Sequence, residues 1–235
     1  MLITRLKLPT QLGASNIRTR AREIASASQI LPQLFLSDYS TALDTKELSR
    51  LGITHVVSVV GFEPGIPDSI PVPGLDSQDA KRTTLKKLHI RLEDAPEANL
   101  LRHLEETTTW IRQAVEENNE NRVLVHCLQG VSRSPTVVCA YLIATTPGPK
   151  AMRAFEALEL VRSKRSVVQP NSGFRKQLEQ FAERFIGGRR IGERNGDQNG
   201  EEAEKAGGRV ISEGIRERIR NLGFGRKLDD DVGGS

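Results

Sequence analysis

The segment VLVHCLQGVSRSPTVVCAYL, residues 123–142, sets the architecture of this chain. It starts within Arg122–His126 (RVLVH), a short β-branched run that is typical of a strand buried on both faces. It ends in an apolar stretch whose spacing predicts a helix from Ser134 onward. The residues between them, Cys127–Arg133, follow neither period. The sequence therefore predicts a buried strand, a tight loop and a helix in direct succession.

The loop between that strand and helix carries three residues suited to phosphate chemistry, Cys127, Gly130 and Arg133. A loop that leads into a helix N-terminus points backbone N–H groups inward, where phosphate oxygens can accept them. Gly130 permits a positive φ or a close approach of backbone to ligand. Arg133 can donate two parallel hydrogen bonds to phosphate, and the same positive surroundings favour a thiolate at Cys127. The loop is thus a candidate phosphate site with a nucleophilic cysteine.

The segment HCLQGVSRS, residues 126–134, resembles the HCxxGxxRS signature of the cysteine-dependent protein tyrosine phosphatases, and specifically their dual-specificity branch. The resemblance covers about residues 28–186. It includes a general-acid region at His89–Ile111 and closing helices at Leu158–Phe185, which contain a Pro170-Asn171 turn. For the loop taken alone, the alternative is a buried cysteine at a strand end beside a surface arginine.

The resemblance implies roles for matching residues. Cys127 would be the nucleophile, Arg133 the phosphate and transition-state clamp, and Asp94 the general acid and base. Ser134 would assist breakdown of the phosphoenzyme, and His126 would orient the loop. The other residues expected to bind the phosphate, together with Arg133, are Leu128, Gln129, Gly130, Val131 and Ser132.

Each of these roles has a purely structural alternative. Asp94 can be a turn or helix-cap aspartate, and Glu93 beside it is a rival acid. Ser134 can serve as a helix N-cap, and His126 can be a buried, hydrogen-bonded histidine. Two further residues are expected to serve the fold, Cys139 as a core thiol and Asn171 in the turn.

Short apolar runs alternate with stretches of helical spacing along residues 28–186. Strands are expected as a pair around Pro32 and at 55–60, 88–92 and 122–126; helices are expected at 43–51, 100–115, from 134, and at 155–161 and 174–185. The pattern predicts an α/β fold with a single central, mostly parallel sheet flanked by helices. The resemblance implies the cysteine-phosphatase form of that fold, with the phosphate-binding loop between a strand and a helix.

The flanking segments differ in composition from this catalytic domain, 28–186. Residues 1–27 are basic and are expected to be a disordered arm, the alternative being an organelle transit peptide. Residues 187–235 are polar and glycine-rich, which predicts a disordered tail, with a transient helix at 211–222 as one exception. Residues 61–86 are rich in proline and glycine and are expected to form a long surface loop.

Composition limits the biochemical class. Two cysteines argue against a disulfide framework and exclude a structural zinc site built on cysteines. The four histidines lack metal-ligand spacing, and the chemistry implied needs no cofactor or metal. A net charge of +4 does not argue for nucleic acid, and no apolar run is long enough to span a membrane. The expected compartment is reducing, cytoplasmic or nuclear, and the expected state is a monomer.

Three functions fit these observations. The first is a protein phosphatase acting on phosphotyrosine and on phosphoserine or phosphothreonine. The others are a catalytically silent phosphoprotein-binding scaffold of the same fold and a phosphatase for RNA or lipid phosphate; uncharged loop positions speak against the last. The expected partners are phosphorylated proteins, and the segment Arg5–Leu8 (RLKL) adds a protein kinase as a candidate, with a solvated arm as the alternative.

Overall fold

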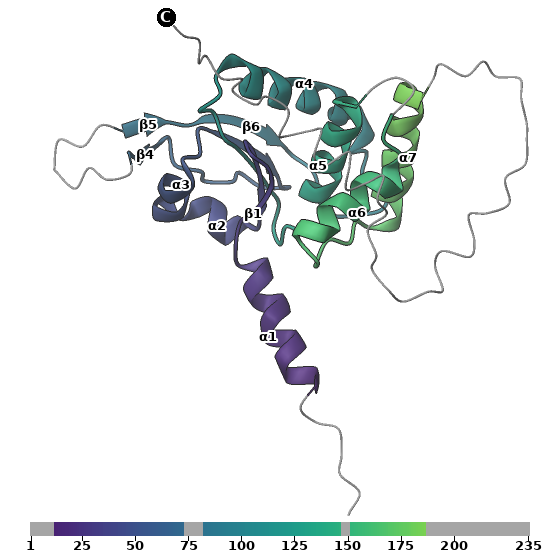
Figure 1. The fold of residues 1–235 in the computed structure, drawn as a ribbon, viewed down its shortest axis with the longest axis horizontal. Helices are drawn as coiled ribbons and strands as arrows, with labels where there is room; N and C mark the ends of the chain where they lie inside the picture. The colour runs from purple at the N-terminus through teal and green to yellow at the C-terminus, as the bar shows by residue number, and fades with distance from the viewer. Residues whose placement is uncertain (1–11, 73–81, 147–150, 187–235) are drawn as a thin grey trace, which may run out of the picture.

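The buried runs that the sequence predicts as strands form the central sheet. The protein is seen in a computed structural model that describes residues 12–72, 82–146 and 151–186. Its five-stranded sheet has the order β1-β2-β7-β3-β6, and every neighbouring pair is parallel except β1 and β2 (Figure 1). The strands are β1 (Ser28–Leu31), β2 (Leu34–Ser37), β3 (His55–Val59), β6 (Lys86–Ile90) and β7 (Val123–His126). The predicted α/β fold with a mostly parallel sheet is confirmed.

Helices cover both faces of the sheet, as the alternating pattern predicts. One face packs against α4 and α5, with α6 and α7 beyond them, and the other carries α2 and α3 (Figure 1). Helix α3 begins after Asp44, whose carboxylate accepts the N–H of Lys46 at 2.9 Å, and it ends at Gly52 with φ of 66°. The bounds are α2 (Tyr39–Leu43), α3 (Thr45–Leu51), α4 (Leu101–Glu117), α5 (Arg133–Ala144), α6 (Ala154–Lys164) and α7 (Ser172–Ile186).

In the proline- and glycine-rich region 61–86, the described part (residues 61–72 and 82–86) has more regular structure than the sequence predicts. It contains a two-stranded antiparallel sheet, β4 (Ser69–Pro71) with β5 (Arg82–Thr84), where a loop without regular structure was expected. Ile70 in β4 and Leu85 after β5 are buried in a small core under α3. These isolated apolar residues show no period, so local pattern could not reveal the strands.

Residues 12–24 form helix α1 (Leu12–Ile24), where the sequence suggested a disordered arm. In Figure 1 this helix extends away from the rest of the domain. Its C-terminal end is held by contacts to a residue about 140 positions later, described below, which no local pattern reports. The expectations for residues 1–11 and for the tail 187–235, including its candidate helix, lie outside the described residues.

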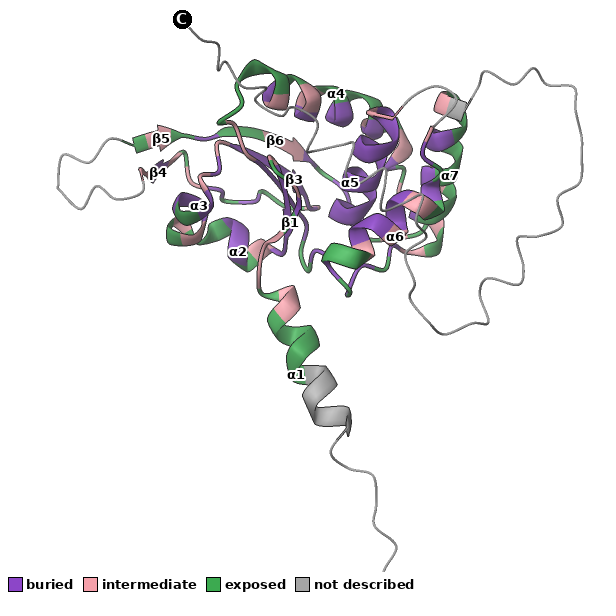
Figure 2. Ribbon diagram, in the orientation of Figure 1, coloured by how far each residue is buried: buried purple, intermediate pink, exposed green. Residues whose placement is uncertain are grey.

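Helix α5 is the centre of the main core. It is buried along its whole length, as Figure 2 shows, and it packs against α4, α6, α7 and the sheet. The rigid strand–loop–helix unit of β7 and α5 thus lies at the middle of the domain.

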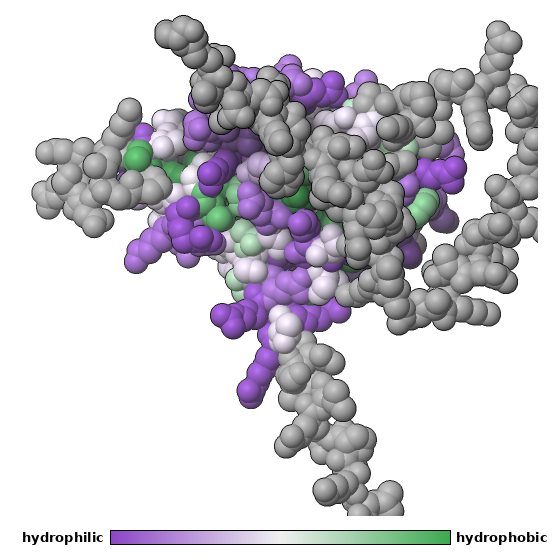
Figure 3. Space-filling model, in the orientation of Figure 1, coloured by the Kyte–Doolittle hydropathy of each residue, from purple (hydrophilic) through white to green (hydrophobic). Residues whose placement is uncertain are grey.

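On the face seen in Figure 3 the described surface is mostly hydrophilic, with small separate apolar patches. Among the described residues, no helix combines the length and apolarity needed to cross a membrane.

Candidate active site at the carboxyl end of the central strand

The loop from Cys127 to Ser132 joins the central strand β7 to helix α5. Gly130 has φ of 65°, and a Cβ there would lie 2.5 Å from the carbonyl oxygen of Ser37. The position therefore requires glycine both for its conformation and for its space. The Gly130 N–H donates to the Cys127 Sγ at 3.2 Å, so the turn folds around the thiol. This is the arrangement that the signature predicts.

The carbonyl groups of this loop are directed away from the thiol and bonded by the surrounding protein. Tyr39 N donates to the Leu128 carbonyl at 3.2 Å, and Gln169 N donates to the Val131 carbonyl at 2.8 Å. The Gln129 and Gly130 carbonyls accept from Arg165. Since the carbonyl and the N–H of one trans peptide unit point in opposite directions, these outside contacts to the carbonyls direct the N–H groups of the same peptides inward, as an anion site requires.

His126, the last residue of β7, lies fully buried beneath the loop. Burial lowers its pKa to about 4, so the ring is neutral at pH 7. Its Nδ1 lies 3.3 Å from the Cys127 carbonyl, which can only accept, so Nδ1 carries the proton and Nε2 accepts from the Ser58 hydroxyl at 2.7 Å. The ring also stacks on Tyr39, with centroids 5.9 Å apart. His126 is therefore a buried histidine with a partner at each ring nitrogen, one of which is the Cys127 carbonyl of the loop.

The structure brings Asp94 to the loop, 33 positions before Cys127 in the chain. Its Oδ2 lies 3.6 Å from Nε of Arg133, whose Nη1 donates to the Leu92 carbonyl at 3.1 Å. Arg133 is 5% exposed, whereas the Asp94 side chain is 36% exposed, so the carboxylate faces the open side of the site. The rival acid Glu93 packs instead against Gly61. Of the two acids, Asp94 is the one placed at the loop.

Two side chains hold Asp94 in this position. Ser132 Oγ donates to Asp94 Oδ1 at 2.7 Å, and Asn171 Nδ2 donates to the same oxygen at 2.8 Å. Asn171 N also donates to Ser132 Oγ at 3.1 Å, which closes the network. The sequence predicts that Asn171 serves the fold, and its Oδ1 does accept the Phe174 N–H at the start of α7. Its contact with Asp94 is an additional one that the sequence did not predict. Nothing local signals the contact to Asp94; it joins segments 77 residues apart.

The remaining predicted residues divide between the site and the core. The Ser134 hydroxyl is buried in the first turn of α5 without a hydrogen-bond partner among the described residues, and it makes no cap bond. The side chains of Leu128 and Gln129 are exposed at the rim, Leu128 by 50%. Cys139 is completely buried in α5, and burial raises the pKa of its thiol, so it is a core residue as predicted.

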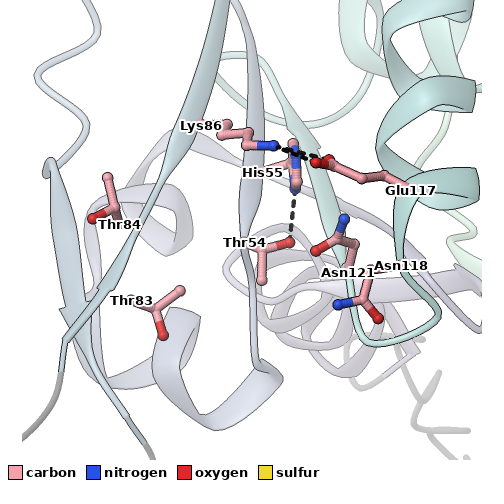
Figure 4. Close-up of a pocket in the computed structure, with 8 residues that line it drawn as sticks. All are labelled: Thr54, His55, Thr83, Thr84, Lys86, Glu117, Asn118 and Asn121. Carbon is pink, nitrogen blue, oxygen red and sulfur yellow. Dashed lines mark hydrogen bonds and ion pairs between the residues drawn. The ribbon is translucent and has the colours of Figure 1, made fainter.

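A pocket lies at the end of the sheet opposite the Cys127–Ser132 loop. It has a volume of about 400 Å³ and is lined by residues at the start of β3 and β6 and at the end of α4 (Figure 4). Lys86 points toward Glu117 across it and pairs with that carboxylate at 2.8 Å. Because the strands are parallel, this pocket is at their amino ends and the phosphate loop at their carboxyl ends, so it contributes nothing to the candidate active site.

Comparison with known proteins supports the resemblance seen in the sequence. A sequence model of the dual specificity phosphatase catalytic domain matches residues 34–184. Mouse dual specificity protein phosphatase 22 is 36% identical over 157 residues, which span 66% of this chain and 72% of that protein. Rat dual specificity protein phosphatase 15 is 35% identical over 154 residues, spanning 66% of this chain and 56% of that protein. The chain thus spans little more than half of the second relative.

Solved structures agree with the sequence comparisons. The human tyrosine phosphatase-like serine/threonine/tyrosine-interacting protein superposes with a TM-score of 0.56 at 28% identity. That match covers 69% of this chain and 99% of the human one. The family model begins at residue 34, so helix α1 precedes the residues that it matches.

Proposed function

The chain belongs to the dual specificity phosphatase family and its domain is a protein phosphatase; from this premise we propose that Cys127, Arg133 and Asp94 carry out its reaction. The observation that carries the proposal is their convergence. The loop folds around the Cys127 sulfur, and Arg133 and the Asp94 carboxylate meet at its open side, although Asp94 comes from a distant segment. A nucleophile, an anion clamp and an acid then face one bound phosphate.

The first step transfers the phosphoryl group to the enzyme. The Cys127 thiolate attacks phosphorus, the sulfur–phosphorus bond forms, and the bond from phosphorus to the substrate oxygen breaks. Asp94, protonated for this step, gives its proton to the leaving oxygen, so the dephosphorylated residue departs as a neutral hydroxyl. The loop N–H groups and Arg133 donate to the equatorial oxygens, where charge is held in the transition state.

The second step returns the enzyme to its starting state. Asp94, now ionised, takes a proton from water, and the water oxygen attacks phosphorus while the sulfur–phosphorus bond breaks. Inorganic phosphate leaves and the thiolate is restored. The Ser134 hydroxyl, buried without a partner in the first turn of α5, is the group suited to donate to the departing sulfur.

The substrates proposed are phosphorylated proteins carrying phosphotyrosine and phosphoserine or phosphothreonine. The uncharged side chains of Leu128 and Gln129 at the rim offer no cations for extra phosphates, which favours a protein over a polyphosphorylated lipid headgroup. A silent phosphoprotein-binding scaffold is the second candidate, since one structural neighbour is the human tyrosine phosphatase-like serine/threonine/tyrosine-interacting protein. The complete Cys127, Arg133 and Asp94 set favours the enzyme.

The test compares wild type with Cys127→Ser and Asp94→Ala on p-nitrophenyl phosphate and on a peptide phosphorylated on both Thr and Tyr. We expect turnover of both substrates by wild type, none by Cys127→Ser, and release of both phosphates from the peptide. Triphosphate RNA and an inositol phospholipid serve as comparison substrates. If reduced, folded wild type binds the peptide but does not hydrolyse it, the scaffold function replaces the phosphatase function.

A further inference from the structure

Arg165, the residue that ends α6, is a charged side chain that the proposed reaction does not use. It is 0% exposed, and a buried guanidinium is tolerated only when its five N–H donors find acceptors. Two of these acceptors belong to the phosphate loop. Nε donates to the Gly130 carbonyl at 3.0 Å, and Nη2 donates to the Gln129 carbonyl at 3.3 Å. The guanidinium therefore lies directly behind the turn that surrounds Cys127.

The other acceptors come from the last turn of α1, from Ser26 just beyond it, and from the Ser28 hydroxyl at the start of β1, 3.3 Å from Nη1. Nη1 donates to the Glu23 and Ser26 carbonyls, both at 2.8 Å, and Nη2 donates to the Ile24 carbonyl at 2.9 Å. The last carbonyls of a helix lack partners within the helix and carry partial negative charge, so they suit a buried cation. The Glu23 carboxylate adds a second link, since it accepts from the backbone N–H and, at 2.6 Å, from the hydroxyl of Ser166.

The loop also rests on Arg165 sterically. A Cβ at Gly130 would lie 2.8 Å from Nη2 of Arg165, so the bare backbone of the loop packs on the guanidinium. Burial lowers the pKa of Arg165, and the charges of Asp38, Glu23 and Cys127 act in the opposite direction. The charged and titratable groups that face the loop are thus Arg133 and Arg165, Asp38 and Asp94, and the neutral His126.

We propose that Arg165 is a positioning residue for the phosphate loop, and that the C-terminal end of α1 acts through Arg165 as part of the same support. By bonding the Gln129 and Gly130 carbonyls on the outer side, Arg165 turns the N–H groups of those peptides toward the sulfur and the phosphate. The carbonyls of α1 hold the guanidinium in that orientation. Helix α1 precedes the family match, which begins at residue 34, so the part of this support that α1 supplies lies outside the matched residues. The inference rests on the proposed function of the loop.

The main test replaces Arg165 by lysine, which keeps the charge but cannot reach the loop and α1 together. The rate of Cys127 alkylation by iodoacetate is measured against pH, with the modified residue identified by mass spectrometry. We expect the midpoint of that profile to rise by about 0.5 to 1 pH unit in Arg165→Lys and further in Arg165→Met. Because loop geometry serves the transition state more than the ground state, kcat falls about tenfold with a smaller change in KM.

The matched control is Arg162→Lys. Arg162 lies in α6, and its Nε donates to the Val168 carbonyl at 3.1 Å and its Nη1 to Glu159 at 3.0 Å; among the described residues its hydrogen bonds do not include the loop. We expect its alkylation profile and kcat to equal those of wild type. The proposal is overturned if Arg165→Lys, folded by its thermal unfolding curve, keeps its alkylation midpoint within about 0.2 pH units and its kcat within about twofold of wild type.

The contribution of α1 is tested by Glu23→Ala, which keeps the backbone carbonyl that Arg165 contacts but removes the carboxylate contacts to Ser166 that anchor the end of α1. The variant is measured alone and combined with Arg165→Lys. If α1 acts through Arg165, we expect a kcat loss of about threefold in the single variant and no further loss in the double variant. If the kcat loss of the double variant equals the product of the two single losses, the proposal that α1 acts through Arg165 is overturned. The alkylation profile needs no substrate, so inactivity of wild type on phosphopeptides would count against the proposed function and would leave this measurement intact.

Discussion

Ser132 Oγ donates a 2.7 Å hydrogen bond to Asp94 Oδ1 across 38 residues of sequence. Ser132 belongs to the phosphate loop and Asp94 to the segment that follows β6. The bond therefore joins the group proposed to bind phosphate to the group proposed to move protons. Asn171 completes the contact from the start of α7. With Asp94 held in this way, the acid is in place before substrate arrives, which removes an ordering cost from catalysis.

We predict that Asn171→Asp separates the two roles of that side chain. The new carboxylate can still accept the Phe174 N–H, so the thermal midpoint should stay close to that of wild type. It can no longer donate to Asp94 and repels it, so kcat on the phosphopeptide should fall about tenfold or more. Asn171→Ala is the comparison, since it loses both contacts. Unchanged kcat in Asn171→Asp would contradict a role in holding Asp94.

For Asp94→Asn, we predict a loss that depends on the leaving group. Kcat on a phosphothreonine peptide should fall by about 10²- to 10⁴-fold, because an alkoxide leaves poorly without a proton donor. The loss on p-nitrophenyl phosphate should be smaller, because p-nitrophenolate leaves readily. Glu93→Gln is the matched control and should stay within about threefold of wild type, since Glu93 packs on Gly61 and not on the loop. An equal loss in both variants would contradict the assignment.

Gly130→Ala should cost more than Gly65→Ala, although both glycines have positive φ values of 65° and 60°. Each substitution carries the penalty of a left-handed conformation, about 1 kcal/mol. At Gly65 the nearest atom to the new methyl is 3.8 Å away, whereas at Gly130 the Ser37 carbonyl is at 2.5 Å. Urea denaturation should therefore show a larger loss for Gly130→Ala, together with loss of phosphate binding. Equal losses would mean that the loop can shift to make room.

The pH dependence of stability should report His126. Its pKa is lowered from 6.5 to about 4 by burial, so between those values the unfolded chain binds a proton that the folded protein does not. Stability is then full above pH 6.5 and falls as the pH drops toward 4, by up to about 3 kcal/mol from this residue. Urea denaturation of His126→Gln should show a shallower fall between pH 6.5 and 4.5. A residual slope is expected, since burial also lowers the pKa of His55.

Thiol labelling should find one reactive cysteine in the folded protein. Both cysteines are buried, but Cys127 lies in the loop proposed to bind phosphate, whereas Cys139 lies inside α5, where burial raises the pKa of its thiol. We expect native Cys127→Ser to resist iodoacetamide and Cys139→Ala to label like wild type. Mass spectrometry of the labelled peptides provides the check. Labelling of Cys139 in the native protein would show that α5 opens on the timescale of the reaction.

Local sequence was sufficient to predict the loop between β7 and α5 and most of the strands and helices around it. A β-branched run, a glycine and an apolar helical run follow each other within 20 residues, and each encodes its conformation through its own neighbours. The order of strands and helices then restricts the sheet to a mostly parallel form, since parallel strands need crossover connections. The strand pair β4–β5 escaped prediction because its apolar residues are too few to show a period.

The contacts between segments that are distant in the sequence could be determined only from the folded structure. The sequence offers Glu93 and Asp94 side by side, and only the path of the chain after β6 places one on the loop and the other on Gly61. The contact of Asn171 with Asp94 and those of Arg165 with Gly130 and α1 link segments that share no pattern. Hydrophobic periodicity reports burial along one element, whereas these bonds depend on where separate elements meet after packing. The candidate catalytic residue types can be identified from local sequence, whereas their positions relative to one another are decided by the tertiary fold.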